Sequence, residues 1–170
     1  MENNLKGKNK INWKISMLWF WASYMLVTLV GIGHTCFNWL VLKMEIDPNI
    51  PVKTMYDILP YAATVPFHPL YNIILWPLFA FLYYKMVKPI KNYWKTTLNL
   101  GLSWVIITII FDLVAWVLIH HPWAMTWKEM YLDYQPWITL IYISIFISPF
   151  IGMVFYLKSI IYNMGLEKSK

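Results

Sequence analysis

The sequence predicts an all-α integral membrane protein, a four-helix bundle that forms a single membrane domain over residues 1–170. Three observations lead to this fold class. The chain is 59% hydrophobic and only 13% charged, whereas soluble domains average about 45–50% apolar and about 25% charged residues. It contains four long apolar runs, and its lysines gather in the gaps between those runs. A lipid bilayer is therefore its expected surroundings.

The apolar runs cover residues 15–42, 58–84, 96–119 and 134–157. Each is longer than the roughly 20 residues that a helix needs to cross a hydrocarbon core about 30 Å thick. Backbone polar groups cannot remain unpaired in lipid, so each run is predicted to be a helix. The first run is too long for a signal peptide and is followed by no small-x-small cleavage site, so we expect it to be a retained span.

The second run differs from the others in its proline content. It contains Pro60, Pro66, Pro69 and Pro77. Each proline removes a backbone donor and clashes with the preceding turn, so we expect this helix to be kinked in its outer half. Irregular backbone at membrane depth is tolerated where protein or a water-filled cavity supplies partners, which makes this segment a candidate cavity wall.

The placement of lysine predicts the orientation. All fourteen basic residues are lysines, and eleven of them precede the first run, separate the second from the third, or follow the fourth. Cytoplasmic segments are enriched in positive charge, so both chain ends are predicted to be cytoplasmic, an N-in and C-in topology. The lysines form no patch with interleaved aromatics, which excludes nucleic acid as a partner. The lysine-only, Ile- and Asn-rich usage is typical of an AT-rich genome, and we expect a multi-pass protein of a bacterial plasma membrane.

Aromatic residues and the single cysteine add two further bounds. Eleven Trp and twelve Tyr make the chain Trp-rich, and both residue types favour the headgroup level of a bilayer. Cys36 is alone, so the sequence allows neither an intrachain disulfide nor a cysteine-based metal cluster.

Three ionisable side chains inside the apolar runs form the candidate site. His34, His68 and Asp112 lie in the first, second and third runs. An ionisable group in a membrane needs a partner or a wet cavity. Counted from the outer ends of their runs, the three residues lie at a similar depth of about 12 Å. They are therefore expected to share one layer.

Helical spacing adds neighbours to this layer. Asn38 follows His34 by four residues and Asn72 follows His68 by four, so each amide shares a helix face with its histidine. Tyr142 of the fourth run is expected to face the same layer. We therefore predict a polar pocket, on the extracytoplasmic side, that binds a small ligand or ion.

Several readings of this layer remain open at the level of sequence. His34, His68 and Asp112 could hold a divalent transition metal, since imidazole and carboxylate suit zinc, iron or copper. A His and Asp pair could serve a membrane-embedded enzyme that acts on a lipid substrate. Haem, a quinone or a proton relay would use the same groups. The polar groups could also only join helices, in a structural subunit or an accessory subunit of a complex with another membrane protein.

Overall fold

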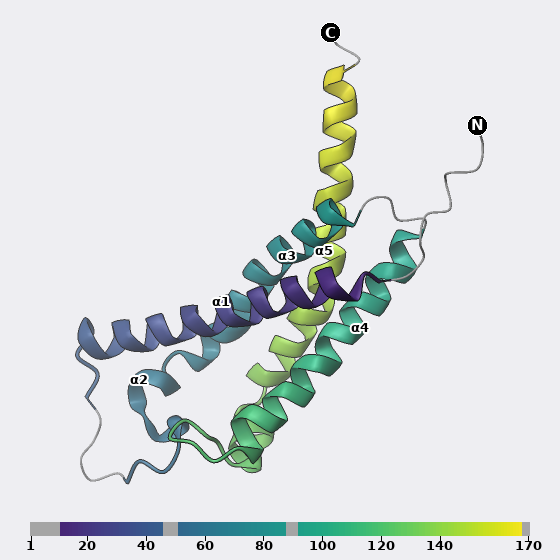
Figure 1. Ribbon diagram of the computed structural model, residues 1–170. Coiled ribbons are helices and arrows are strands. Elements are labelled where there is room, and N and C mark those ends of the chain that lie inside the picture. Colours follow the sequence, from purple (N-terminus) through teal and green to yellow (C-terminus); the bar gives the residue numbers. More distant parts are fainter. Residues whose placement is uncertain (1–10, 46–50, 88–91, 168–170) are drawn as a thin grey trace.

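The computed structural model describes residues 11–45, 51–87 and 92–167, with side chains described as far as residue 163. Four long helices dominate it: α1 (Trp13–Leu40), α3 (His68–Met86), α4 (Tyr93–Asp112) and α5 (Trp137–Glu167) (Figure 1). The described ranges contain no strand. These helices, together with short helical segments next to two of them, make up four candidate membrane spans: Trp13–Leu40, Leu59–Met86, Tyr93–Leu118 and Trp137–Asn163. The predicted all-helical architecture, with four helices long and apolar enough to span a membrane, is confirmed for the described residues.

The second span consists of three successive helical pieces. Two short helices, α2 (Leu59–Ala62) and η2 (Val65–Phe67), precede α3. Each of the three pieces has a proline in its first turn, namely Pro60, Pro66 and Pro69. A first-turn residue has no intrahelical acceptor for its amide, so proline fits there without loss of a hydrogen bond.

The third span changes its winding directly after Asp112. There α4 continues as the π-helical segment η3 (Leu113–Leu118). The amide of Ile119 donates to the carbonyl of Val114, five residues back, at 3.0 Å. Two further short helices, η1 (Met55–Asp57) and η4 (Glu129–Asp133), belong to the connections at the end of the bundle remote from the start of α1 and the end of α5 (Figure 1). These connections are named the outer connections for that position.

Glycines allow α5 to approach its neighbours closely. A Cβ atom added at Gly152 would lie 2.6 Å from Cβ of Ala80 on α3, and one added at Gly101 on α4 would lie 2.7 Å from the carbonyl oxygen of Phe146. Small residues at such crossings let helix backbones pack tightly in a membrane. The helix α5 is therefore the centre of the bundle, with α3 and α4 against it and α1 against α3.

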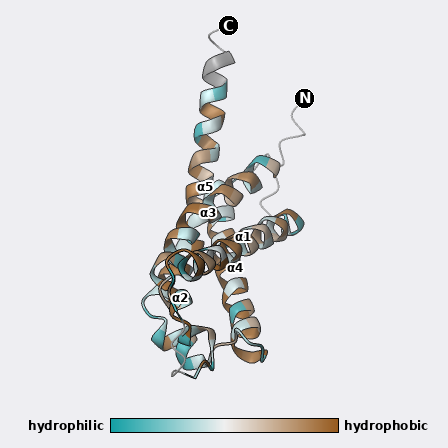
Figure 2. Cartoon of the chain, turned by 90° about the vertical axis from the view of Figure 1, so that its left-hand side faces the viewer, coloured by the Kyte–Doolittle hydropathy of each residue, from teal (hydrophilic) through white to brown (hydrophobic). Residues whose placement is uncertain are grey.

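The two ends of the bundle differ. The start of α1, the end of α3 and the end of α5 lie toward one end of the molecule (Figure 1). Hydrophobic residues predominate along the helices, and hydrophilic residues gather in the connections at the opposite end (Figure 2). The last helix extends to Glu167, beyond the predicted end at residue 157, because no proline stops it there.

Two hydrophobic cores lie along the bundle axis. The larger one is rich in aromatic residues and includes Phe20, Trp76, Tyr84, Trp104 and Tyr156. The smaller one lies near the outer connections and consists of Tyr61, Val65, Met125, Met130, Tyr134 and Ile138. The candidate site lies between these two cores.

Candidate functional site

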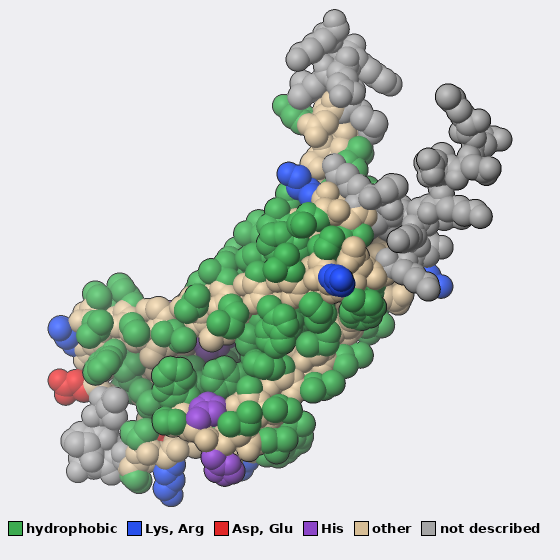
Figure 3. Space-filling view, in the orientation of Figure 1, with side chains coloured by type: hydrophobic (Ala, Val, Ile, Leu, Met, Phe, Trp, Pro, Cys, Tyr) green, Lys and Arg blue, Asp and Glu red, His purple; other side chains and the backbone are tan. Residues whose placement is uncertain are grey.

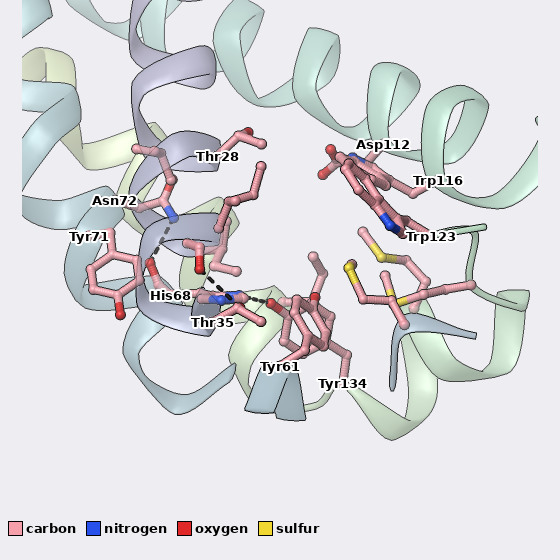
Figure 4. Close-up of a pocket in the computed structure, with 18 of the residues that line it drawn as sticks. Thr28, Thr35, Tyr61, His68, Tyr71, Asn72, Asp112, Trp116, Trp123 and Tyr134 are labelled. Carbon is pink, nitrogen blue, oxygen red and sulfur yellow. Dashed lines mark hydrogen bonds between the residues drawn. The ribbon is translucent and has the colours of Figure 1, made fainter. Parts of the chain in front are cut away.

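A cavity of about 430 Å³ separates the two cores (Figure 4). Its walls come from the outer half of α1, from α2 and α3, from the end of α4 with η3, and from the start of α5. Most of the lining is aromatic or aliphatic, and a few polar side chains interrupt it. Ligand sites in proteins have this character: a largely apolar concavity with a small number of placed polar groups.

Several residues that line the cavity on α1 and on the hairpin between η3 and η4, residues 119–128, are exposed. Ile32, Cys36 and Trp39 line the cavity and lie four and three residues apart, on one face of α1. These three residues are exposed, Trp39 to 55%, and Trp123 on the hairpin is exposed to 53%. Ile32, Cys36 and Trp39 belong to the last third of the candidate membrane span Trp13–Leu40. Figure 3 shows a face of the bundle on which hydrophobic side chains predominate, with histidines on its lower part and lysines toward its two ends.

Asp112 is the centre of one polar group in this cavity. Its Oδ1 accepts a hydrogen bond from the Tyr24 hydroxyl at 2.6 Å, and its Oδ2 accepts one from the Tyr142 hydroxyl at 3.1 Å. The indole Nε1 of Trp116 donates to the Tyr24 oxygen at 2.8 Å. The π-helical segment thus brings Trp116 into a chain of donors that ends on the carboxylate. Asp112 is only 5% exposed.

His68 is the centre of the second polar group. Its Nδ1 is hydrogen bonded to the Tyr134 hydroxyl, and its Nε2 lies 3.0 Å from the Thr64 hydroxyl oxygen. Since the Thr64 hydroxyl donates to the carbonyl of Tyr61 at 2.7 Å, it must accept from His68. With Thr64 as the acceptor, Nε2 of His68 carries the hydrogen in this contact. A histidine that acts as a general base toward a hydroxyl makes the hydrogen bond in the opposite direction.

The other predicted site residues lie close to the cavity or support it. Asn72 lines it and donates through Nδ2 to the carbonyl of His68 at 2.8 Å. His34 is hydrogen bonded to Tyr71, whereas Asn38 donates to the carbonyl of Pro60 at 3.0 Å and joins α1 to α2. His34, Asn38 and Tyr142 are not among the lining residues. The structure therefore places His68, Asn72 and Asp112 at the cavity and the other three residues behind its walls.

The metal hypothesis gains no support from this geometry. Within the described part of the chain, no group of three or more His, Cys, Asp or Glu side chains is placed to hold a metal ion. Both ring nitrogens of His68 already have protein partners. The polar groups instead form separate clusters, one on each histidine and one on Asp112, each completed by tyrosine.

Sequence reasoning found Tyr142 but missed the other aromatic partners of the site, Tyr24, Trp116, Tyr134 and Tyr71. Tyr24, Thr28, Gly31 and Thr35 all line the cavity, and their spacing of four, three and four residues puts them on one face of α1. That stripe is a signal that the sequence contains. Trp76 lies at the boundary with the larger core, and its buried Nε1 has no hydrogen-bond partner among the described residues.

A network of hydrogen bonds joins the two outer connections beside the smaller core. The Thr54 hydroxyl donates to Oε1 of Glu129 at 2.6 Å, and the amides of Lys53 and Thr54 donate to Oδ2 of Asp57 at 2.9 and 3.1 Å. These amide bonds hold the pKa of Asp57 below its ordinary value. Burial acts to raise the pKa of Glu129, but hydrogen bonds from Thr54 and Thr126 outweigh it and leave that pKa lowered.

Comparison of the chain with protein-family models, curated proteins and solved structures finds no match. The function of the site is therefore argued from its own residues.

Proposed function

We propose that this protein binds a small hydrophobic ligand that enters the cavity sideways from the bilayer. The observation that carries this proposal is a largely apolar cavity of about 430 Å³ with exposed lining residues on a candidate membrane span of α1, from which we infer an opening toward the bilayer between α1 and the hairpin of residues 119–128. A ligand dissolved in lipid would reach such an opening without crossing water. The few polar side chains at Asp112 and His68 would orient its polar end.

The proposal also includes the orientation of the protein in the membrane and the cause of the interrupted second span. The lysine distribution supports an N-in and C-in orientation, which puts the cavity in the extracytoplasmic half of a plasma membrane, bacterial by residue usage. We attribute the interruption of the second span to Pro60, Pro66 and Pro69, since a proline inside a continuous helix would leave a carbonyl without a donor. The interruption supplies part of the cavity wall. A role as accessory subunit of a membrane complex is compatible with ligand binding.

The enzyme alternative is less well supported. The Thr28 and Thr35 hydroxyls in the cavity donate to carbonyls of their own helix at 2.9 and 3.0 Å. The hydrogen bond between His68 and Thr64 runs in the direction opposite to that of a base and its nucleophile. A purely structural role is supported for Asn38, which does not line the cavity and whose hydrogen bond to the carbonyl of Pro60 joins α1 to α2.

Two glycines of α1 provide a matched test of ligand binding. Gly31 lines the cavity, and a Cβ added there would lie 3.8 Å from Nε2 of His68, whereas a Cβ added at Gly33 would meet nothing within 4 Å. Gly31→Phe should fill the cavity, and Gly33→Phe should leave it open. Both changes replace glycine in the same helix, where phenylalanine has the better helix propensity.

The assay uses the full chain in phosphatidylcholine nanodiscs and a neutral octanol analogue that carries a photoactivatable diazirine. Peptide mapping should show saturable labelling of cavity residues such as Met125 and Met130. Gly31→Phe should reduce this labelling by about tenfold, the effect of about 1.4 kcal/mol of lost binding free energy. Gly33→Phe should leave it unchanged. Equal labelling in the two variants, or labelling spread evenly over lipid-facing residues, would reject a binding cavity.

A further inference from the structure

We propose that the cavity selects a lipophilic organic cation, an amphiphile with an ammonium or similar positive group, and that Asp112 is the residue that binds its charge. This inference rests on the proposed function and specifies the chemical class of its ligand. It comes from three features: a carboxyl group without a counter-ion, unfilled acceptor positions on that group, and an aromatic lining.

Asp112 is the one carboxyl residue inside the four candidate membrane spans. The ion pair found among the described residues joins Lys128 and Asp133 in the outer connection, and no described lysine pairs with Asp112. The lysines within the spans, Lys14, Lys85, Lys95 and Lys158, belong to the opposite end of the bundle. An unpaired carboxylate in a low-dielectric site is unfavourable unless a positive group compensates it.

The carboxyl group is also open to a ligand. A carboxylate offers about four acceptor positions on its two oxygens, and the bonds from Tyr24 and Tyr142 occupy two of them. Both partners are hydroxyl donors and add no charge. In Figure 4 the carboxylate of Asp112 points toward the middle of the pocket. A cation in the cavity could therefore approach the carboxylate directly.

Aromatic residues make up much of the cavity wall, two of them beside Asp112. Tyr24 and Trp116 are hydrogen bonded within the Asp112 group, and Tyr61, Trp76 and Tyr134 line the remainder of the wall. The faces of Trp and Tyr rings attract cations, and sets of such rings are a known means of binding quaternary ammonium groups. A carboxylate with aromatic walls favours a cation over an anion or a neutral hydrocarbon of the same shape. The aliphatic part of the lining suits the apolar remainder of the ligand.

The test compares two molecules of the same shape that differ in charge, phenyltrimethylammonium and tert-butylbenzene. Each competes with the neutral diazirine probe for cavity labelling in phosphatidylcholine nanodiscs, which carry no net surface charge. We expect the cation to protect the cavity at a concentration about tenfold lower than the hydrocarbon does. Asp112→Asn should remove this difference and leave protection by tert-butylbenzene unchanged. Asp133→Asn, the same substitution at an outer carboxylate, should have no effect.

The outcomes separate this inference from the proposed function. Equal protection by the two molecules, or preference for the cation that persists in Asp112→Asn, would overturn the role of Asp112 and leave a neutral binding cavity. Absence of saturable labelling and of protection by either molecule would overturn the proposed function as well. If Asp112→Asn does not fold, the comparison on the unmodified protein still decides, because equal protection there contradicts cation selection.

Discussion

Substitution of Gly152 by alanine should destabilise the bundle by separating α5 from α3. The added methyl carbon would lie 2.6 Å from Cβ of Ala80 and 2.7 Å from the backbone nitrogen of Phe81. Carbon atoms pack best at about 3.5–4.0 Å, so the two helices must move apart by about 1 Å. Overpacking of this kind costs about 1–3 kcal/mol, and alanine returns about 1 kcal/mol through its helix propensity. Because backbone atoms are involved, we expect a net loss near the upper limit, about 2 kcal/mol.

Thermal unfolding in detergent, followed by tryptophan fluorescence, measures this effect. Gly33→Ala is the matched control, since a Cβ at that position meets nothing within 4 Å. It should leave the melting temperature unchanged or raise it. Gly101→Ala should behave like the Gly152 variant, because its Cβ would lie 2.7 Å from the carbonyl oxygen of Phe146. Equal melting temperatures for the Gly152 and Gly33 variants would refute the close packing of α3 and α5.

Three further predictions concern the helix joint, the outer connections and the topology. Asn38→Leu removes the hydrogen bond to Pro60 and should lower the free energy of unfolding by about 0.6 kcal/mol, the average for such bonds in membranes. Asn99→Leu, at an exposed position of α4, is its control. An equal loss of unfolding free energy in the two variants would contradict a stabilising role for the hydrogen bond between Asn38 and Pro60. Folding lowers the pKa values of Asp57 and Glu129. The two carboxylates therefore stabilise the folded state at pH above about 4, the pKa of such groups in the unfolded chain, and this stabilisation is lost as the pH falls through their pKa values in the folded protein. Amide exchange at Thr54, corrected for its intrinsic rate, should therefore accelerate in acid, and Glu129→Gln should weaken that pH dependence; exchange independent of pH would contradict it. In a Cys36→Ser background, Asn92→Cys should resist a membrane-impermeant thiol reagent in intact cells, and efficient labelling would reverse the proposed orientation.

The spans could be predicted from sequence because they depend on a property that is summed over many residues. Twenty or more apolar residues leave a chain in lipid no alternative to a helix, and α1, at Trp13–Leu40, begins and ends two residues before the predicted 15–42. The end of α5 was not predicted, because the apolar run ends at residue 157 while the helix continues through the more polar residues 158–167.

The candidate site was predictable only in part. His68, Asn72 and Asp112 were found because charged and amide groups at membrane depth are rare and need partners. Of the partners of Asp112, Tyr142 was found, but Tyr24 and Trp116 were not, since Tyr and Trp are common residue types in this chain and the stripe that includes Tyr24 shows only a shared helix face. Contact between Tyr24 and Asp112 depends on how α1 lies relative to α4, which is a tertiary property. The predicted convergence of the two histidines and Asp112 on one ion also assumed helix rotations that the sequence does not specify.

The most direct test of the central claim is an experimental structure of the protein in lipid after exposure to bromobenzene, with the anomalous signal of bromine used to find the ligand. A bromine peak is expected inside the cavity, between α1 and the Asp112 group, reached from the side beside Trp39. A cavity closed by its own side chains, with bromine found only on lipid-facing surfaces, would contradict the proposal that this protein binds a ligand from the bilayer.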